Sequence, residues 1–224
     1  MITNYYNLEE ICKLTSTKSS YLVLISQINS GLFQDLFHSI INNTENNIIF
    51  QNLNKVYEIT TPSNQNKSKN ISYIDLSLCE IELRRIYNIS KNEEIIIFKI
   101  ETYYKEYKIP IIEYELFSEN GEINYDLNFC SKLKSYIYIP VSINEEEEYK
   151  YNPNDKYYND RCDQYTSPDR TDITIYYRKN EFNSYHMSLC EQDCEYKGYN
   201  KDKKMVKYKC DIKGLISNFD KKKY

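Results

Sequence analysis

The chain has 224 residues, 41% of them hydrophobic, and a formal net charge of −4 at pH 7. This apolar content allows one large domain or two small ones, and it argues against a wholly disordered chain. The mildly acidic balance argues against a broad surface for nucleic acid or anionic membranes, because those partners need clustered lysine and arginine.

Residue usage is biased toward amino acids with AT-rich codons. The sequence has 25 tyrosines, four glycines, no tryptophan and no alanine. Because much of this bias reflects the genome, the number of tyrosines is weak evidence for a binding function. Tyrosine still favours half-buried sheet surfaces, and it must supply core bulk where smaller apolar residues are scarce.

Residues 1–62 are predicted to form an N-terminal helical segment and a hairpin. Apolar residues at helical spacing indicate helices over Leu8–Lys13 and Gly31–Ile41. The second helix carries an apolar stripe made of Leu32, Phe33, Leu36, Phe37 and Ile40. The runs Ile48–Leu53 and Val56–Thr60 are typical of two hairpin strands around a turn at Asn54-Lys55.

Residues 71–143 are predicted to form a β-rich α+β domain, after a flexible polar loop over Thr61–Asn70. Asn120-Gly121 is a strong hairpin signal between two of its strands. Pro140 indicates that the last strand is an edge, and a free edge at Tyr136–Ile139 would allow pairing between copies. The predicted elements are a helix at Cys79–Tyr87 and strands at Ile71–Leu76, Glu94–Tyr103, Ile111–Phe117, Ile123–Leu127 and Tyr136–Val141.

A domain boundary is predicted at Asn144–Lys150, where four consecutive glutamates repel each other and stay solvated. Residues 151–213 have few runs long enough for regular structure and are predicted to form a small cysteine-stapled module. Residues 214–224 include a lysine triplet and are typical of a tail or linker. The predicted fold class is α+β. It has a β-rich body with one or two helices packed on a mixed or antiparallel sheet, followed by a small loop-rich disulfide module.

The seven cysteines are the main candidates for covalent structure. Cys79 lies where a predicted strand meets the helix and Cys130 follows a strand end, so a disulfide would pin the helix to the sheet. Two buried free thiols are the alternative at these positions. Because seven is odd, one thiol has no partner in the chain, and Cys12 is the one expected to be left over.

The last four cysteines lie in a segment with little apolar periodicity, which is expected to rely on covalent or metal cross-links. They are Cys162, Cys190, Cys194 and Cys210. Disulfides with three possible connectivities are expected. Structural zinc is the rival, since the Cys190–Cys194 spacing is near that of zinc ligands, but free thiols also stay open. The acidic cluster from Asp155 to Asp172 is expected to be a solvated loop with Asx turns and not a calcium site.

Enzyme chemistry has no positive signal in the sequence. The only histidines are His38 and His186, and neither lies in a motif of the nucleophile–base type. The four glycines are too far apart for a phosphate-binding loop. We therefore expect no catalytic residues, no cofactor and no metal.

Acceptor sequences for N-glycosylation occur four times, and composition alone would produce about three of them. They start at Asn42, Asn66, Asn70 and Asn88. They permit glycosylation without proving it. Asn66 and Asn70 fall in the predicted loop, where a glycan would fit.

From Tyr73 onward the chain resembles a family of repeated ectodomain modules in very large surface proteins of AT-rich microbial eukaryotes. The elements that carry the resemblance are IDLSLCEIELRRIYNIS (74–90), IPIIEYELF (109–117), YDLNFC (125–130), IYIPVSI (137–143), YNPNDKYYNDRCDQYTSPDRTDIT (151–174) and LCEQDCEYKGYN (189–200). The resemblance covers roughly two-thirds of the chain and implies an architecture and a location more than an activity. The sequence departs from it at Arg170, where the family carries glycine, and at Tyr208-Lys209-Cys210, where the family carries Cys-x-Cys.

The predicted function is a non-catalytic extracellular structural or adhesive module, for instance one unit of an array or filament on a cell surface. One alternative is a glycan- or ligand-binding domain that uses exposed tyrosines such as Tyr151, Tyr157 and Tyr158. Another is an intracellular zinc-stabilised interaction domain, because no secretion signal precedes the first predicted elements. The expected partners are proteins, copies of the chain itself or glycans, and no membrane-spanning segment is expected.

Overall fold

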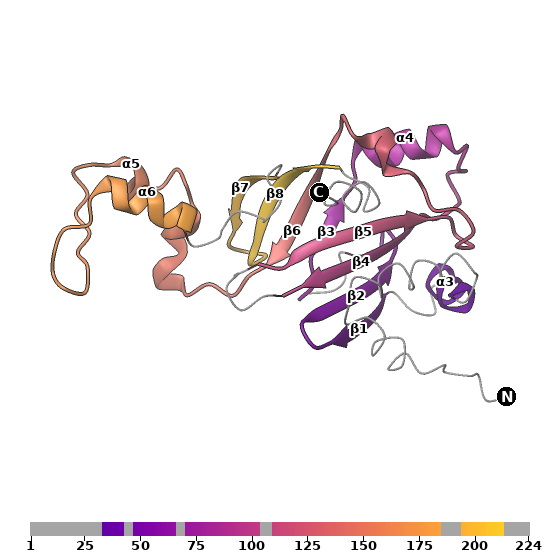
Figure 1. Cartoon of the computed structure of the whole chain (residues 1–224), viewed down its shortest axis with the longest axis horizontal. Helices are drawn as coiled ribbons and strands as arrows, with labels where there is room; N and C mark the ends of the chain where they lie inside the picture. Colours follow the sequence, from indigo (N-terminus) through magenta and orange to yellow (C-terminus); the bar gives the residue numbers. More distant parts are fainter. Residues whose placement is uncertain (1–32, 43–46, 66–69, 104–108, 185–193, 213–224) are drawn as a thin grey trace, which may run out of the picture.

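Two four-stranded antiparallel sheets form the framework of the molecule (Figure 1). The computed structural model describes residues 33–42, 47–65, 70–103, 109–184 and 194–212. The predicted helix at Leu8–Lys13 and the tail at 214–224 lie outside these ranges. The fold is α+β and rich in strands, as the sequence predicts.

Sheet A has the strand order β1-β2-β4-β5. Its strands are β1 (Ile48–Asn52), β2 (Lys55–Thr60), β4 (Ile96–Thr102) and β5 (Ile111–Phe117). The predicted hairpin of β1 and β2 is confirmed, but its turn lies at Leu53-Asn54, one residue earlier than expected. Sheet A thus pairs strands from either side of the boundary expected after residue 62.

The central strand β4 is buried on both faces of sheet A. On one face Phe98 and its neighbours pack against α3 (Gln34–Ile41) through Phe33, Phe37 and Ile40. The predicted apolar stripe of this helix is therefore confirmed for its described residues. On the other face Ile97 lies in a second core that is shared with sheet B.

A tight turn follows β5 and brings the chain against α3. Gly121 has a φ of 74°, and a Cβ atom there would lie 2.7 Å from the Phe37 ring. Glycine therefore meets both the backbone conformation and the close approach that this turn requires. The Asn-Gly turn is confirmed, but the strand expected at Ile123–Leu127 is wrong. Only a single bridge joins Phe117 to Asn124 before the short helix η2 (Leu127–Cys130) begins.

Sheet B has the strand order β3-β6-β8-β7. Its strands are β3 (Tyr73–Asp75), β6 (Lys134–Pro140), β8 (Met205–Asp211) and β7 (Cys194–Asn200). Because β6 pairs with both β3 and β8, the expectation of an edge strand at Tyr136–Ile139 is wrong. Val141 N donates a hydrogen bond to Lys204 O, on the side of β8. The nitrogen of the preceding residue, Pro140, therefore points to the opposite side of β6, beyond the end of β3. Proline fits there because that position has no ladder bond to donate.

The predicted C-terminal disulfide module is present, and its described end consists of the strands β7 and β8. They pair over most of their length, with a register shift between Tyr196 and Gly198, and β8 then pairs with β6. The signal was present in β8, where buried Val206, Tyr208 and Cys210 alternate with lysines. Sheet B thus also pairs strands from either side of an expected boundary.

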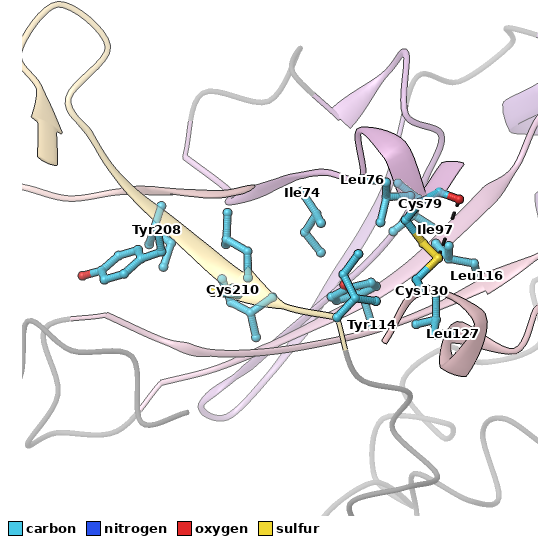
Figure 2. Close-up of a cluster of buried hydrophobic side chains, with 14 of the residues drawn as sticks. Ile74, Leu76, Cys79, Ile97, Tyr114, Leu116, Leu127, Cys130, Tyr208 and Cys210 are labelled. Atoms are coloured by element: carbon cyan, nitrogen blue, oxygen red, sulfur yellow. Dashed lines mark hydrogen bonds between the residues drawn. A yellow bond between two sulfur atoms is a disulfide. The ribbon is translucent and has the colours of Figure 1, made fainter. Parts of the chain in front are cut away.

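The two sheets and α4 (Leu78–Ile86) enclose the larger hydrophobic core (Figure 2). Sheet A contributes Ile97 and Leu116, and sheet B contributes Tyr208 and Cys210. The buried face of α4 contributes Cys79 and Leu83, which confirms the predicted helix.

The polar segment after β2 is more ordered than its composition suggests. Gln65 is buried and pairs with the backbone of Ile74, donating through Nε2 to the carbonyl oxygen at 2.6 Å and accepting from the amide at 2.8 Å. This amide side chain continues the hydrogen bonding of β3. The expectation of a flexible loop is therefore wrong for its described first half.

A lobe between β6 and β7 lies to one side of the two sheets (Figure 1). It contains η3 (Glu145–Tyr151), α5 (Lys156–Asn159) and α6 (Ile175–Ser184). Asn144 caps η3 and Asp155 caps α5, because each side chain accepts a hydrogen bond from a backbone amide. The four glutamates at the predicted boundary thus lie in a short helix.

Candidate functional site

The disulfide between Cys79 and Cys130 joins α4 to η2, as predicted. Both residues are fully buried in the larger core, beside Leu116 and Leu127 (Figure 2). The bond closes a loop with a sequence separation of 51. Cross-links of this kind stabilise a fold by about 2–4 kcal/mol, mainly through the unfolded chain.

A second disulfide joins Cys194 to Cys210, which face each other across β7 and β8. This choice among the possible connectivities was open in the sequence. It removes both cysteines from the alternative zinc site. Within the described residues no group of three or more His, Cys, Asp or Glu side chains is placed to hold a metal ion.

The remaining cysteines differ from the expectation of a complete disulfide set. Cys162 is exposed and its thiol is unbonded in the structure. The other four cysteines of the described ranges are bonded to one another, so none of them is the partner expected for Cys162. Cys190 and Cys12 lie outside the described residues, so the predictions for them stay predictions.

The tyrosines expected to stack on sugar rings are buried. Tyr151, Tyr157 and Tyr158 have 7%, 1% and 3% of their surface exposed. The expectation that they are exposed is therefore wrong. Tyr157 packs edge-on against the ring of Tyr165 at a centroid distance of 4.5 Å, and Tyr158 donates its hydroxyl to Lys150 O. Tyr157 and Tyr165 thus lie in the interior of the lobe, whereas Tyr151 belongs to the larger core.

Arg178 on α6 holds this aromatic interior together, which the sequence did not predict. Only 2% of its surface is exposed. Its guanidinium donates to Tyr157 O at 2.9 Å and to Ile173 O at 2.8 Å. It also lies 5.2 Å from the ring centre of Tyr165, a cation–π contact. The arginine therefore has a structural role in the lobe.

The acidic residues of the lobe act as turn and ion-pair partners, as expected. The Asp155 carboxylate accepts a hydrogen bond from Tyr157 N, and the Asp160 carboxylate accepts one from Cys162 N at 2.8 Å. Lys156 lies 3.1 Å from Asp163 and, through its hydrogen bond, keeps the pKa of that carboxyl below its ordinary value. These carboxylates thus serve local Asx turns and one surface ion pair.

A set of aromatic and cationic side chains lies on the face of sheet B that points away from the core. We call Tyr73, Tyr136, Tyr138 and Lys207 the tyrosine face. Ile137 and Ile139 point into the core, so the alternating Tyr136 and Tyr138 point outward. The rings of Tyr73 and Tyr138 stack at a centroid distance of 4.3 Å. Lys207 Nζ lies 4.0 Å from the ring centre of Tyr136.

The tyrosine face is partly exposed and pre-ordered. Cross-strand partners fix its members, since Tyr73 pairs with Tyr138 and Tyr138 pairs with Lys207. Burial raises the pKa of the Tyr73 phenol above its ordinary value of 10.0. Flat aromatic surfaces beside a cation can stack on planar or ring-shaped ligands. The sequence signal was the alternation of tyrosine with isoleucine in β6.

A second constellation is buried on the inner face of sheet A. Lys99 on β4 lies 2.6 Å from Glu58 Oε2 on β2 and 3.3 Å from Glu101 Oε1. The three side chains are almost wholly buried, with 0% to 1% of their surface exposed. Lys99 Nζ also donates to Ser72 O. No sequence pattern predicts this cluster, because each residue looks like the polar position of an ordinary strand.

The carboxylates of this cluster differ in their hydrogen bonds. Glu101 accepts from Ser72 N at 2.8 Å, from Ser72 Oγ at 2.5 Å and from Tyr103 OH at 2.6 Å. Glu58 Oε1 accepts from Asn47 Nδ2 at 2.8 Å. Glu58 Oε2 contacts only the Lys99 charge, and its geometry satisfies no hydrogen bond within the described residues.

The electrostatics of the cluster follow from burial. Burial raises the pKa of Glu58 above its ordinary value, although the Lys99 charge opposes the rise. Burial and the charge of Glu101 raise the pKa of the Tyr103 phenol. Two carboxyl groups and one amine therefore share a site that solvent does not reach.

Three of the four acceptor asparagines lie in described parts of the chain. Asn42, Asn70 and Asn88 are exposed, so each could carry a glycan without displacing the core. Asn66 lies outside the described residues. Their modification stays a prediction.

None of the helices in the described ranges is long and apolar enough to cross a membrane. The resemblance to ectodomain modules stays a prediction. Comparison with protein-family models, with curated proteins and with solved structures finds no match to this chain.

Proposed function

We propose that the chain is a non-catalytic structural or adhesive module of an extracellular or cell-surface protein. The proposal rests on the way the fold is cross-linked. Each disulfide fastens a different part of the framework, one between α4 and η2 and one between β7 and β8. Protein disulfides form and persist mainly in oxidising compartments.

The single observation that carries the proposal is the position of Cys79 and Cys130. Both sulfur atoms lie in the core, at 0% exposure, where a reductant has no direct access. A buried bond between helix and core acts as a permanent cross-link and not as an exposed redox switch. A module that must keep its shape outside the cell gains from such a bond.

The experiment is a mass measurement on protein from its natural source. Thiols are alkylated under denaturing conditions before and after reduction, and each cysteine is assigned by peptide mapping. We expect Cys79, Cys130, Cys194 and Cys210 to react only after reduction. Cys162, which is exposed and unbonded, is the internal control and reacts without reduction. Reaction of Cys79 and Cys130 without reduction would overturn the extracellular assignment.

A second candidate function is recognition of a glycan or other ligand through the tyrosine face. The supporting observation is the stacked pair Tyr73 and Tyr138 beside Lys207, on a sheet face turned away from the core. Such rings stack on the apolar faces of sugars, and the ammonium can bind an acidic group.

This candidate is tested with a glycan array. Tyr136→Ser removes a ring from the tyrosine face, and Tyr176→Ser removes an exposed ring from α6 as the matched control. Binding to one glycan class that Tyr136→Ser abolishes and Tyr176→Ser retains would support recognition at this face. Equal binding by both variants, or none by the unaltered chain, would remove it.

A further inference from the structure

The contact between Lys99 and Glu58 brings an amine close to a carboxyl carbon. Lys99 Nζ lies 2.6 Å from Glu58 Oε2. A carboxyl C–O bond is about 1.2 Å long, so Nζ lies within about 3.9 Å of Glu58 Cδ. Reacting atoms in near-attack geometries are about 3–3.5 Å apart. A small movement would therefore bring the two groups to bonding approach.

The surroundings disfavour the ionised state of Glu58. Both side chains are fully buried, and Glu101 adds a second negative charge beside them. Burying charges costs free energy unless they are fully paired and hydrogen-bonded, and within the described residues Glu58 Oε2 has the Lys99 contact alone. A reaction that removed the charges of Lys99 and Glu58 together would remove this cost.

We propose that Lys99 and Glu58 condense into an amide, which links β4 covalently to β2 inside sheet A. The nucleophile is Lys99 Nζ and the electrophile is Glu58 Cδ. One C–N bond forms, one C–O bond of the carboxyl breaks, and one water molecule leaves. The reaction is not a redox step and requires no cofactor.

The first step is proton transfer from the Lys99 ammonium to Glu58 Oε2 across the 2.6 Å contact. It produces a neutral amine with its lone pair toward a neutral carboxylic acid. The raised pKa of Glu58 favours this direction of transfer. The carbonyl oxygen of Ser72 accepts a hydrogen bond from Nζ and holds the amine in place.

Attack of Nζ on Cδ then moves negative charge onto Glu58 Oε1. Asn47 Nδ2 already donates to this oxygen at 2.8 Å and stabilises the oxyanion. Thr60 holds the Asn47 side chain by donating its hydroxyl to Oδ1 at 2.8 Å. The donor is thus oriented before the reaction begins.

Glu101 completes the proton balance. Its Oε1 lies 3.3 Å from Nζ, close enough to accept the proton that the attacking nitrogen must lose. It returns that proton to the leaving Glu58 hydroxyl, which departs as water while the carbonyl at Oε1 re-forms. Ser72 and Tyr103 hydrogen-bond to Glu101 and hold it in place. Each side chain of the cluster therefore has one role in a single-turnover reaction.

The test is the intact mass of the full chain, purified after folding with its disulfides formed, then denatured and reduced. We expect a mass lower by one water than the sequence requires. Trypsin does not cleave after an acylated lysine, so Lys99 would stay inside one peptide, residues 92–105. That peptide would be joined to residues 56–67, which contain Glu58.

Two variants separate the mechanism from a change in folding. Glu101→Gln keeps the shape of the side chain but cannot accept the proton, so the full mass is expected. Glu115→Gln alters another buried glutamate, on the strand next to β4, and should still lose one water. Near-ultraviolet circular dichroism of both variants establishes that they are folded.

The unaltered chain decides the question even if Glu101→Gln fails to fold. A folded chain with both disulfides and its full mass would overturn the proposal and leave the cluster as an ion pair. Loss of water at any other pair of residues would overturn it as well. This outcome is independent of the compartment in which the protein acts.

Discussion

Gly121 lies against the ring of Phe37, and a Cβ atom at position 121 would sit 2.7 Å from Cε2 of that ring. The turn after β5 is thereby fitted to helix α3. Gly121→Ala should lower the free energy of unfolding by about 1–3 kcal/mol, because the ring must move within a packed core. Urea unfolding measures the change.

Gly198→Ala is the matched control for this substitution. Gly198 also has a positive φ, at 125°, but nothing lies within 4 Å of the added atom. Both variants carry backbone strain, and only Gly121→Ala adds the clash. An equal loss of stability in the two variants would contradict the proposed contact with Phe37.

Removal of the buried disulfide should destabilise the protein by about 2–4 kcal/mol. The double variant Cys79→Ala with Cys130→Ala loses the constraint on the unfolded chain and some packing in the larger core. Cys162→Ala, at an exposed thiol, should change stability by less than about 0.5 kcal/mol. The measurement is the midpoint of urea unfolding. An equal shift of the midpoint in the two variants would contradict a stabilising role of the disulfide.

Stability should fall at alkaline pH because buried tyrosines resist ionisation. Burial, with the nearby Glu93 charge, raises the pKa of Tyr125 from 10.0 to about 12. Between these values the unfolded chain loses this proton and the native state keeps it, so stability falls as pH rises. Unfolding free energies should be measured from pH 9 to pH 12.

Tyr125→Phe should lessen this alkaline decline, since phenylalanine cannot ionise in either state. Tyr176→Phe, at a ring that is 70% exposed, is the control and should leave the pH dependence unchanged. The interpretation fails if the two variants have the same slope as the unaltered chain.

Arg170 adopts a backbone conformation that glycine prefers, with a φ of 62°. Arg170→Gly should raise the free energy of unfolding by about 1 kcal/mol, because residues with a Cβ are strained there. The turn is fastened by a hydrogen bond from Arg170 N to Ser167 O.

Arg161→Gly is the control for the lost charge. Arg161 is also exposed and lies in the same lobe, but its φ is not positive. Arg161→Gly should slightly lower the free energy of unfolding, since glycine adds conformational freedom to the unfolded chain. Thermal unfolding that shows a loss at both positions would argue against backbone strain at Arg170.

The sequence alone determined most of the local structure. Alternating apolar residues predicted β2, β4, β5 and β6, and helical spacing predicted α3 and α4. Local order depends on neighbours that are near in the chain, so periodicity reveals it. The pairing of Cys79 with Cys130 also followed, because both flank predicted elements.

The tertiary structure alone decided which strands from distant parts of the chain are neighbours. Sheet order placed β6 at the centre of sheet B, although Pro140 suggested an edge, and it brought β8 beside β6 from far along the chain. Such pairings depend on contacts between residues that are distant in sequence, and no local pattern encodes them. The burial of Tyr157 around Arg178 has the same origin.

The cluster at Lys99 illustrates the physical reason. A lysine and two glutamates in strands look solvated when each strand is considered by itself. Stacking sheet A on sheet B turned their face inward, and pairing of β2 with β4 set Glu58 opposite Lys99. The order of residues thus determines which side chains alternate along each strand. The packing of the sheets determines that Lys99 and Glu58 meet in a buried site.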